Sequence, residues 1–192
     1  SGADRLFYKP NNPYSFGAAL CFNSFSIDLT MKFPYLTKDY RKKGESDIFR
    51  VRLGYNKPKL WMSTMVQFIH GFYLDNIEKF DPEWFDRNDS YLLRPDIINM
   101  TWYTAAFYSF NHRKITYQSS IGWEQRQKKS AGTFLLGGSA LVNYLAADSS
   151  IIPGVVASQF SDELAITEQL NLQFGLSIGY VHAFMITPRL YF

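Results

Sequence analysis

The residues best suited to catalysis or metal binding in this chain of 192 residues are scattered along it. The chain has three histidines, His70, His112 and His182, and a single cysteine, Cys21. None of them follows the HxH, HxxxH or CxxC spacing of transition-metal sites, so the sequence predicts no metal site. One cysteine also excludes a disulfide framework. We therefore expect neither a metal ion nor a cofactor.

Nucleophilic catalysis is the remaining enzymatic alternative. Ser130, Ser149 and Ser150 are expected in loops, and His70 is expected at the end of a strand, as in a hydrolase on the rim of a membrane barrel. Catalytic triads are recognised by geometry, and no spacing here brings a serine, a histidine and an acid together. Loop serines also form turns by bonding nearby backbone groups. We expect no enzymatic role, with a lipid-modifying or hydrolytic barrel enzyme as the alternative; a serine oxygen within hydrogen-bond reach of His70 would favour it.

A third group consists of charged residues on the polar sides of expected strands. Its members are Asp28, Lys32, Arg50, Arg52 and Glu124. If these side chains point into a narrow barrel they must be paired or hydrated, because an isolated buried ion costs several kcal/mol. They form either a salt-bridge network that plugs the lumen or a basic path for anionic solutes. We expect at least one arginine to pair with a carboxylate, Asp28 on the preceding strand being the nearest candidate.

The long loops carry a fourth set of charges. Basic residues that are candidates for contact with lipid phosphates lie in loops 34–47 and 125–131: Arg41, Lys42, Lys43, Arg126, Lys128 and Lys129. Loop 71–96 is acidic and could hold a cation, although Asp86-Arg87-Asn88-Asp89 is too short and generic for a calcium loop. Solvated charge with weak ion pairs between loops, each contributing about 0–1 kcal/mol, explains the same residues. Strand parity predicts that all three loops lie at one end.

The elements that must position these residues are strands with a period of two. Apolar and polar residues alternate without error over 24–33, and the pattern recurs over 49–55, 115–124 and 170–180. Weaker strands are expected near 13–22, 59–70, 97–110, 132–146 and 184–192, and 161–169 is the only weak helix candidate. Tight turns at 22–23, 56–58 and 111–113 would then lie at one end and long loops at the other, as in outer-membrane barrels. The long stretch 147–167 does not fit this arrangement, because it would fall at the end that holds the tight turns.

The chemistry of the two strand faces favours a membrane. In the three clearest strands the polar face carries only three charges, Asp28, Lys32 and Glu124, among Ser, Thr, Asn, Gln and Gly. The other face is bulky and apolar, as expected of a lipid-facing surface, and aromatic residues near strand ends resemble interfacial girdles. A soluble, lipocalin-like carrier with the apolar face inward stays open as an alternative. The net charge of +3 is too small to indicate nucleic-acid binding.

Several motifs in order resemble a known family. They are Tyr8-Lys9-Pro10-Asn11, Gly71-Phe72-Tyr73-Leu74, Arg94-Pro95-Asp96, 126–132 (RQKKSAG) and Ala147-Asp148-Ser149-Ser150. Together they resemble a family of unknown function whose members are predicted outer-membrane barrels, found chiefly in Bacteroidetes. The resemblance implies a barrel with further strands before and after this region. Because the family has no established activity, it implies no catalytic residue.

The sequence thus predicts an all-β chain, with residues 1–192 forming one antiparallel up-and-down transmembrane β-barrel of about 9–12 strands. We expect it in a bacterial outer membrane, in a structural or scaffold role or in small-solute passage. Expected partners are outer-membrane lipid and other envelope proteins in a complex, and no nucleic acid. The count of nine strands is odd, so a further strand, in 151–160, beyond either end or from a partner, is expected to complete the barrel.

Overall fold

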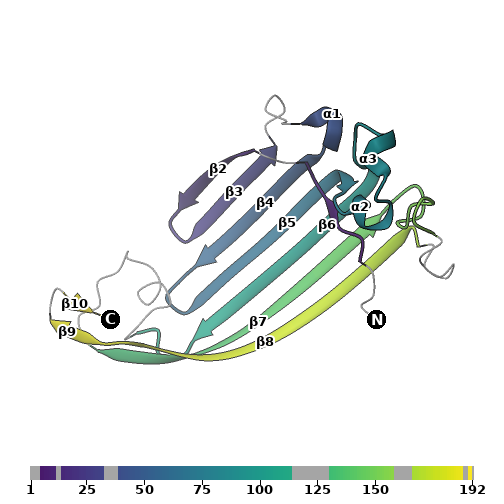
Figure 1. The fold of residues 1–192 in the computed structure, drawn as a ribbon. Helices are drawn as coiled ribbons and strands as arrows, with labels where there is room; N and C mark the ends of the chain where they lie inside the picture. Colours follow the sequence, from purple (N-terminus) through teal and green to yellow (C-terminus); the bar gives the residue numbers. More distant parts are fainter. Residues whose placement is uncertain are drawn as a thin grey trace.

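The described part of the chain is an all-β structure built on one large antiparallel sheet (Figure 1). The computed structural model describes residues 5–11, 14–32, 39–113, 130–157, 166–187 and 190–191. Seven long strands follow one another across the sheet in chain order, each paired with the next. These strands are β2 (Ser15–Phe22), β3 (Phe25–Lys32), β4 (Asp47–Asn56), β5 (Leu60–Leu74), β6 (Leu92–Ser109), β7 (Ala131–Ala146) and β8 (Glu168–Ala183). This up-and-down order confirms the antiparallel, all-β prediction.

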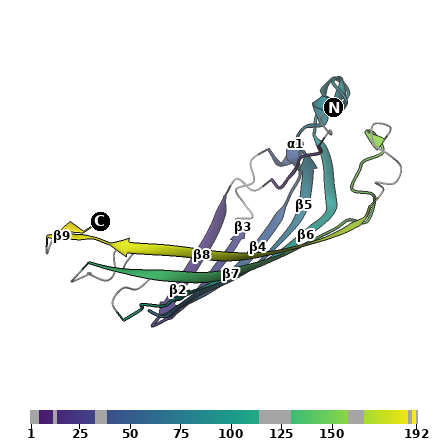
Figure 2. The same cartoon turned by 90° about the horizontal axis from the view of Figure 1, so that it is seen from below.

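Three short strands complete the described structure. β1 (Tyr8–Lys9) is the eighth strand of the large sheet and pairs with β5 at Leu74 and Tyr73. β9 (Met185–Thr187) and β10 (Leu190–Tyr191) pair only with each other. The long strand expected at 184–192 is therefore not formed. The sheet is strongly curved (Figure 2), and among the described residues its edge strands β2 and β8 do not pair with each other.

Strand register divides the sheet into two chemically different faces. Because side chains alternate along each strand, residues directly opposite one another share a face. One central row contains only apolar residues across all seven strands: Ala18, Leu29, Val51, Val66, Trp102, Val142 and Leu172. The neighbouring row on the opposite face contains Gly17, Thr30, Arg50, Gln67, Thr101, Asn143 and Asn171. We call these surfaces the apolar face and the polar face.

The apolar face is the more exposed of the two. On β3, Phe25 and Leu29 are 62% and 40% exposed, whereas the polar Ser26, Asp28 and Thr30 are only partly exposed. On β8, Leu172 and Phe174 are 54% and 81% exposed. This agrees with the expectation that the large apolar side chains of 24–33 and 170–180 face outward. The polar face also carries apolar side chains, including Trp61 and Phe107, whose rings lie 5.7 Å apart.

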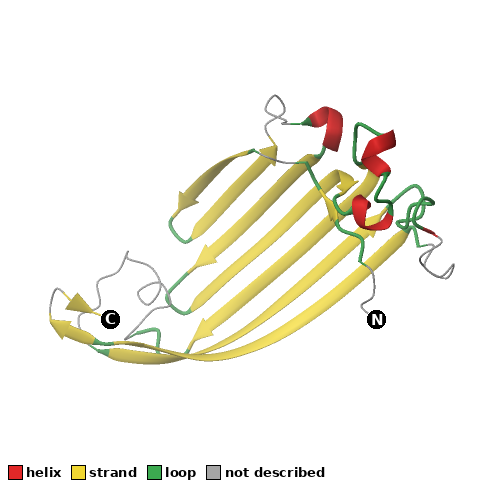
Figure 3. Ribbon diagram, viewed as in Figure 1, coloured by secondary structure: helices red, strands yellow, loops and turns green. Residues whose placement is uncertain are grey.

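The two ends of the sheet differ. The end that we call the loop end holds the connections β3–β4, β5–β6 and β7–β8, whereas the turn end holds the tight turns β2–β3 and β4–β5 and the β6–β7 connection. Three short helices lie at the loop end (Figure 3): α1 (Tyr40–Lys43), α2 (Ile77–Phe80) and α3 (Trp84–Arg87). Within the described ranges, no helix combines the length and hydrophobicity needed to cross a membrane.

Two topological expectations need correction. β6 pairs directly with β7 from Ile98 to Ser109, so no strand from 115–124 lies between them; that segment itself lies outside the described residues. The β7–β8 connection consequently falls at the loop end. The long stretch 147–167 therefore lies with the other long loops and not with the tight turns. β7 begins with Ala131 at the turn end, so the described end of the expected loop 125–131, Ser130 and Ala131, lies at the end opposite Arg41–Lys43. The expectation that all charged loops lie at one end is wrong.

Candidate functional site

A compact cap covers the loop end of the sheet. Its hydrophobic centre consists of the buried side chains Leu74, Ile77, Phe80 and Val156. These come from the end of β5, from α2 and from the β7–β8 connection. Aromatic residues pack around the centre, with the ring of Tyr91 5.1 Å from that of Tyr73 and 5.0 Å from that of Phe85. We call this cluster and its polar contacts the cap.

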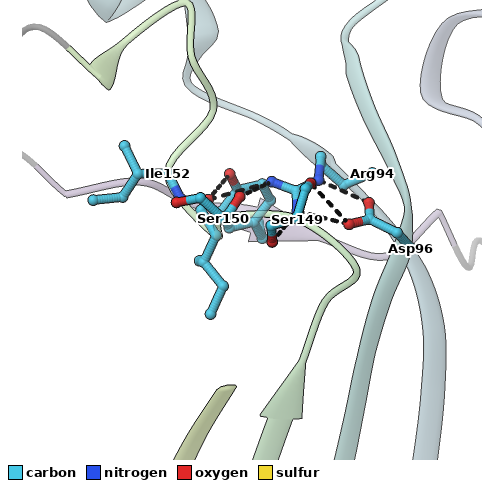
Figure 4. Close-up of polar contacts among 7 residues, drawn as sticks. Arg94, Asp96, Ser149, Ser150 and Ile152 are labelled. Atoms are coloured by element: carbon cyan, nitrogen blue, oxygen red, sulfur yellow. Dashed lines mark hydrogen bonds and ion pairs between the residues drawn. The ribbon is translucent and has the colours of Figure 1, made fainter. Parts of the chain in front are cut away.

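Arg94 joins the cap to the sheet (Figure 4). Its guanidinium binds Asp96 through two parallel hydrogen bonds of 2.8 Å, Nε to Oδ1 and Nη2 to Oδ2. Nη1 donates to the carbonyl of Ser150 at 2.8 Å, and Nη2 donates to the carbonyl and the hydroxyl of Ser149 at 3.3 and 3.2 Å. Arg94 is only 7% exposed. A bidentate ion pair that also binds backbone carbonyls fixes the β7–β8 connection on β6.

The charged groups at this junction have shifted pKa values. The hydrogen bond from Arg94 lowers the pKa of Asp96 from 3.8 to about 2. Tyr8 donates its hydroxyl to the carbonyl of Ile151 at 2.6 Å, and burial raises the pKa of Tyr8 to about 12. Asp96 therefore stays ionised and Tyr8 stays protonated across the neutral range, which is the state that the observed hydrogen bonds require.

The N-terminal segment is also held in the cap. Lys9 forms an ion pair with Asp75 at 2.6 Å. The backbone N–H of Asn11 donates to the hydroxyl of Ser46 at 2.7 Å, and both residues are buried. The side-chain amide of Asn11 donates to the carbonyl of Gly44 at 2.8 Å. Residues 8–11 thus contact three parts of the cap: the segment before β4, the end of β5 and the β7–β8 connection.

Gly71 allows β5 to bend into the cap, and we expect its replacement by alanine to lower the free energy of unfolding by about 1–3 kcal/mol. Its φ is +83°, and the ladder between β5 and β6 shifts register between His70 and Phe72. A Cβ atom here would overlap the carbonyl oxygen of Glu45. Reversible urea unfolding in detergent micelles measures the change. Gly154→Ala is the control, because a Cβ at Gly154 meets nothing within 4 Å; equal losses in both variants would contradict the expectation.

The lowered pKa of Asp96 predicts a loss of stability in acid. A carboxyl whose pKa is lower in the folded chain stabilises it above the unfolded pKa of about 3.9 and loses this contribution as the pH falls toward 2. We expect the difference in unfolding free energy between the wild type and Asp96→Asn to shrink by on the order of 1 kcal/mol between pH 5 and pH 2, after allowance for solvent screening. Urea titrations of both proteins at each pH measure this difference, and a constant difference would contradict the assignment.

The polar face receives four of the five charged residues predicted for a lumen. Asp28 lies opposite Arg52, and Thr30 lies opposite Arg50, while Lys32 is one further pleat along β3. Arg50 donates its Nε to Oε1 of Gln67 at 2.7 Å. Within the described part of the chain, neither arginine forms an ion pair with a carboxylate, so the expected pair with Asp28 is not formed. Glu124 lies outside the described residues.

Several of the charged loop residues have partners at the loop end. The ammonium of Lys43 lies 5.4 Å and 5.7 Å from the rings of Tyr73 and Tyr91, and Arg41 lies over Tyr40. Lys42 and the other residues of α1 are at the loop end. In the expected acidic loop, Asp75, Asp81 and Asp96 pair with Lys9, Arg87 and Arg94. Arg126, Lys128 and Lys129 lie outside the described residues.

Within the described residues His70 forms no hydrogen bond with a serine hydroxyl, whereas the hydroxyl of Tyr180 lies 2.9 Å from Nδ1 of His182. Nδ1 of His70 lies 3.9 Å from Oδ2 of Asp47, and both side chains are largely exposed. Ser149 and Ser150 instead form hydrogen bonds within the cap, where the Ser150 hydroxyl accepts one from the Ile152 N–H at 3.2 Å. Across the described ranges, no group of three or more His, Cys, Asp or Glu residues could hold a metal ion.

Comparison with known proteins identifies a family. One family model, described as "Domain of unknown function (DUF4421)", matches residues 3–192. The chain belongs to this family. Neither the curated proteins nor the solved structures gave a significant match.

Four of the five motifs that suggested a family meet in the cap of this DUF4421 chain. Residues 8–11, 71–74 and 94–96, and the stretch 147–150, contribute the contacts described above, whereas 126–129 lies outside the described residues. The sequence does not indicate that these motifs meet, because each one alone is typical of a loop or a strand end. The one signal that could have indicated it was the spacing of Arg94 and Asp96, which lie on the same side of a strand as a ready ion pair.

Proposed function

We propose that this chain forms the wall of a bacterial outer-membrane β-barrel, with the apolar face against lipid and the polar face toward a hydrated interior. Its role is structural, as a scaffold in an envelope assembly, or the passage of small solutes, without catalysis. The observation that carries the proposal is the central apolar row across seven strands, backed by a polar row of small, amide and arginine side chains. Membrane barrels alternate in this way.

The exposure of the two faces favours this arrangement over a lipocalin-like carrier. A soluble barrel would enclose its apolar side chains and leave its charged face to water. In this chain Leu29 is 40% exposed, whereas Asp28 and Thr30 on the same strand are only partly exposed. The polar face is therefore the better candidate for the enclosed side.

The tryptophan at the centre of the apolar face has a hydrogen-bond partner within the sheet. The indole N–H of Trp102, at the centre of this face, donates to Oγ1 of Thr64 at 2.9 Å. In a bilayer, where water is absent, an unpaired polar group costs several kcal/mol. The Trp102–Thr64 hydrogen bond removes this penalty at the position where it would be largest.

The height and the borders of the apolar face suit a bilayer. On β8 it runs from Leu170 to Tyr180, about 33 Å along a strand at ~3.3 Å per residue. A strand tilted by 35–45° would then span roughly 25 Å, the usual height of the apolar band. Asp47 and His70 border the face at the loop end. Aromatic pairs border it at the turn end, with Phe25 5.0 Å from Tyr55 and Phe134 4.9 Å from Tyr180.

The open edges of the sheet support the expectation of further strands or partners. Within the described residues, β8 pairs only with β7 and β2 only with β3. In lipid the backbone N–H and C=O groups of an edge strand must find hydrogen-bond partners. A membrane location therefore requires strands other than β2–β8 to pair with both edges of the sheet. By the usual orientation of bacterial barrels, the cap would face outward and the tight turns would face the periplasm. Outer-membrane lipid and envelope proteins are the proposed partners, and nucleic acid is not.

Tryptophan fluorescence in brominated lipid tests the proposal. Trp102 lies on the apolar face and Trp61 on the polar face, on register-paired strands. Two single-tryptophan proteins, each with the other three tryptophans replaced by phenylalanine, are reconstituted in vesicles of brominated phosphatidylcholine. We expect strong quenching of Trp102 and weak quenching of Trp61. Equal quenching of the two, or failure of the protein to enter the vesicles, would contradict the proposal.

A further inference from the structure

A hollow of about 390 Å³ lies on the polar face near the turn end of the sheet. Side chains from β3, β4, β5 and β6 contribute to its walls. Those used below are Ser26, Arg52, Asn56, Trp61, Ser63 and Tyr103. The volume falls within the range of sites for small molecules, and the walls combine aromatic rings with a few polar groups, as is usual in such sites.

Arg52 supplies a cation that none of the described residues neutralises. Among the described residues, no carboxylate lies within 4 Å of its guanidinium, and it forms no hydrogen bond. Arg50, one pleat away on the same face, differs because it donates to Gln67. A planar guanidinium with unused donors is the group best suited to bind a carboxylate through two parallel bonds.

Asn56 adds a second polar group that lacks a partner. Its Oδ1 is inaccessible to solvent and has no hydrogen-bond partner in the described part of the chain. Buried polar atoms in proteins normally have a hydrogen-bond partner, which a bound water molecule can also supply. Gly54 keeps this region open, because a Cβ at that position would overlap the hydroxyl of Ser26. Ser26 and Ser63 line the same hollow.

The charge of the polar face favours an anion. In the described parts of β2–β8, this face carries three cations, Lys32, Arg50 and Arg52, and one anion, Asp28. Trp61 and Tyr103 offer flat surfaces on which an aromatic or other planar body can pack. The combination therefore selects for negative charge at one end of a ligand and for an apolar, planar surface at the other.

We propose that this hollow is a binding site for small organic anions, specifically carboxylates with a flat apolar body. Arg52 binds the carboxylate, the two serine side chains bind polar groups next to it, and Trp61 and Tyr103 contact the ring. The inference rests on the proposed function, since it names the class of solute that the hydrated interior would hold or pass.

Calorimetric titration of the detergent-solubilised full chain with benzoate tests the site. We expect saturable binding that Arg52→Gln weakens at least tenfold. Arg52→Lys should retain part of the affinity, because it keeps the charge, which separates loss of the anion site from misfolding. Arg50→Gln is the matched control and should change the affinity less than twofold, since Arg50 is bound to Gln67. Benzamide, which has the same ring without the charge, should bind at least tenfold more weakly than benzoate.

The outcomes distinguish the site from the proposed function. Absence of saturable benzoate binding, or equal effects of Arg52→Gln and Arg50→Gln, would overturn the site even if lipid quenching of Trp102 places the protein in a membrane. Benzoate binding that depends on Arg52, in a protein whose Trp102 is not quenched by brominated lipid, would overturn the membrane function and leave the anion site in a soluble sheet.

Discussion

Replacement of Arg94 by glutamine is expected to lower the free energy of unfolding by about 3–5 kcal/mol, because it removes one partner of a buried ion pair. The guanidinium is 7% exposed and is bound both to the carboxylate of Asp96 and to the carbonyls of Ser149 and Ser150. Glutamine cannot satisfy these acceptors together. Asp96 would remain as a largely enclosed carboxylate without its cation, and the β7–β8 connection would lose its attachment to β6.

Arg87 provides the matched control for this prediction. It forms a similar pair with Asp81, at 2.6 Å, but its side chain is 60% exposed. Exposed pairs contribute about 0–1 kcal/mol, so Arg87→Gln should change stability by no more than that. Urea unfolding of the three proteins in detergent measures both effects. If Arg94→Gln is no more harmful than Arg87→Gln, Arg94 does not hold the cap as described.

Replacement of Leu172 by arginine is expected to cost about 2–4 kcal/mol when the protein is embedded in phospholipid vesicles. Leu172 lies in the central apolar row, next to Val142, and is 54% exposed in the isolated sheet. A charge at this depth would face the hydrocarbon core of the bilayer. In water the same substitution at a half-exposed position would have little effect.

Gln173→Arg is the control for the lipid-facing position. Gln173 is the next residue on β8, lies on the polar face and is exposed. It should tolerate arginine, because a charge there would point into the hydrated interior. Unfolding free energies of both variants in vesicles measure the difference. Equal costs at the two positions would show that the faces do not experience different solvents.

The alternation of residue types predicted the strands well where it was clean. β3 and β8 form within two or three residues of the expected limits, because their large apolar and small polar residues alternate without interruption. β5 and β6 extend further toward the loop end than expected, to Leu74 and from Leu92. Between His70 and Phe72 the ladder shifts register, because β6 advances four residues, from Ile98 to Arg94, where β5 advances two. The period of two is broken there although both strands continue.

Strand pairing and the cap could not be predicted in the same way. The alternation at 115–124 indicates a strand with two unlike faces, but it does not indicate which strand would pair with it. In the structure β6 pairs with β7. In the cap, Arg94 binds carbonyl groups that follow it by 55 and 56 residues. Backbone carbonyls leave no signature in a sequence, so a contact of this kind depends on the three-dimensional path of the chain.

The cap changes the meaning of the charged loops. From sequence, Lys43 was a candidate for lipid contact, but its ammonium lies over the rings of Tyr73 and Tyr91. Asp75 and Asp81, expected in an acidic loop, pair with Lys9 and Arg87. These charges stabilise the loop end of the sheet. Arg52 on the polar face, which has no ion-pair partner among the described residues, is therefore the better candidate for ligand binding.

The central claim, that lipid contacts one face and water the other, is tested most directly by spin labels placed one at a time along β8 from Leu170 to Tyr180. The protein is reconstituted in vesicles with Cys21, an exposed free cysteine, replaced by serine. Collision with oxygen, which concentrates in lipid, should be strong at even-numbered positions, and collision with a water-soluble nickel chelate should be strong at odd-numbered positions. Equal access of the nickel chelate to both sets of positions would contradict the account.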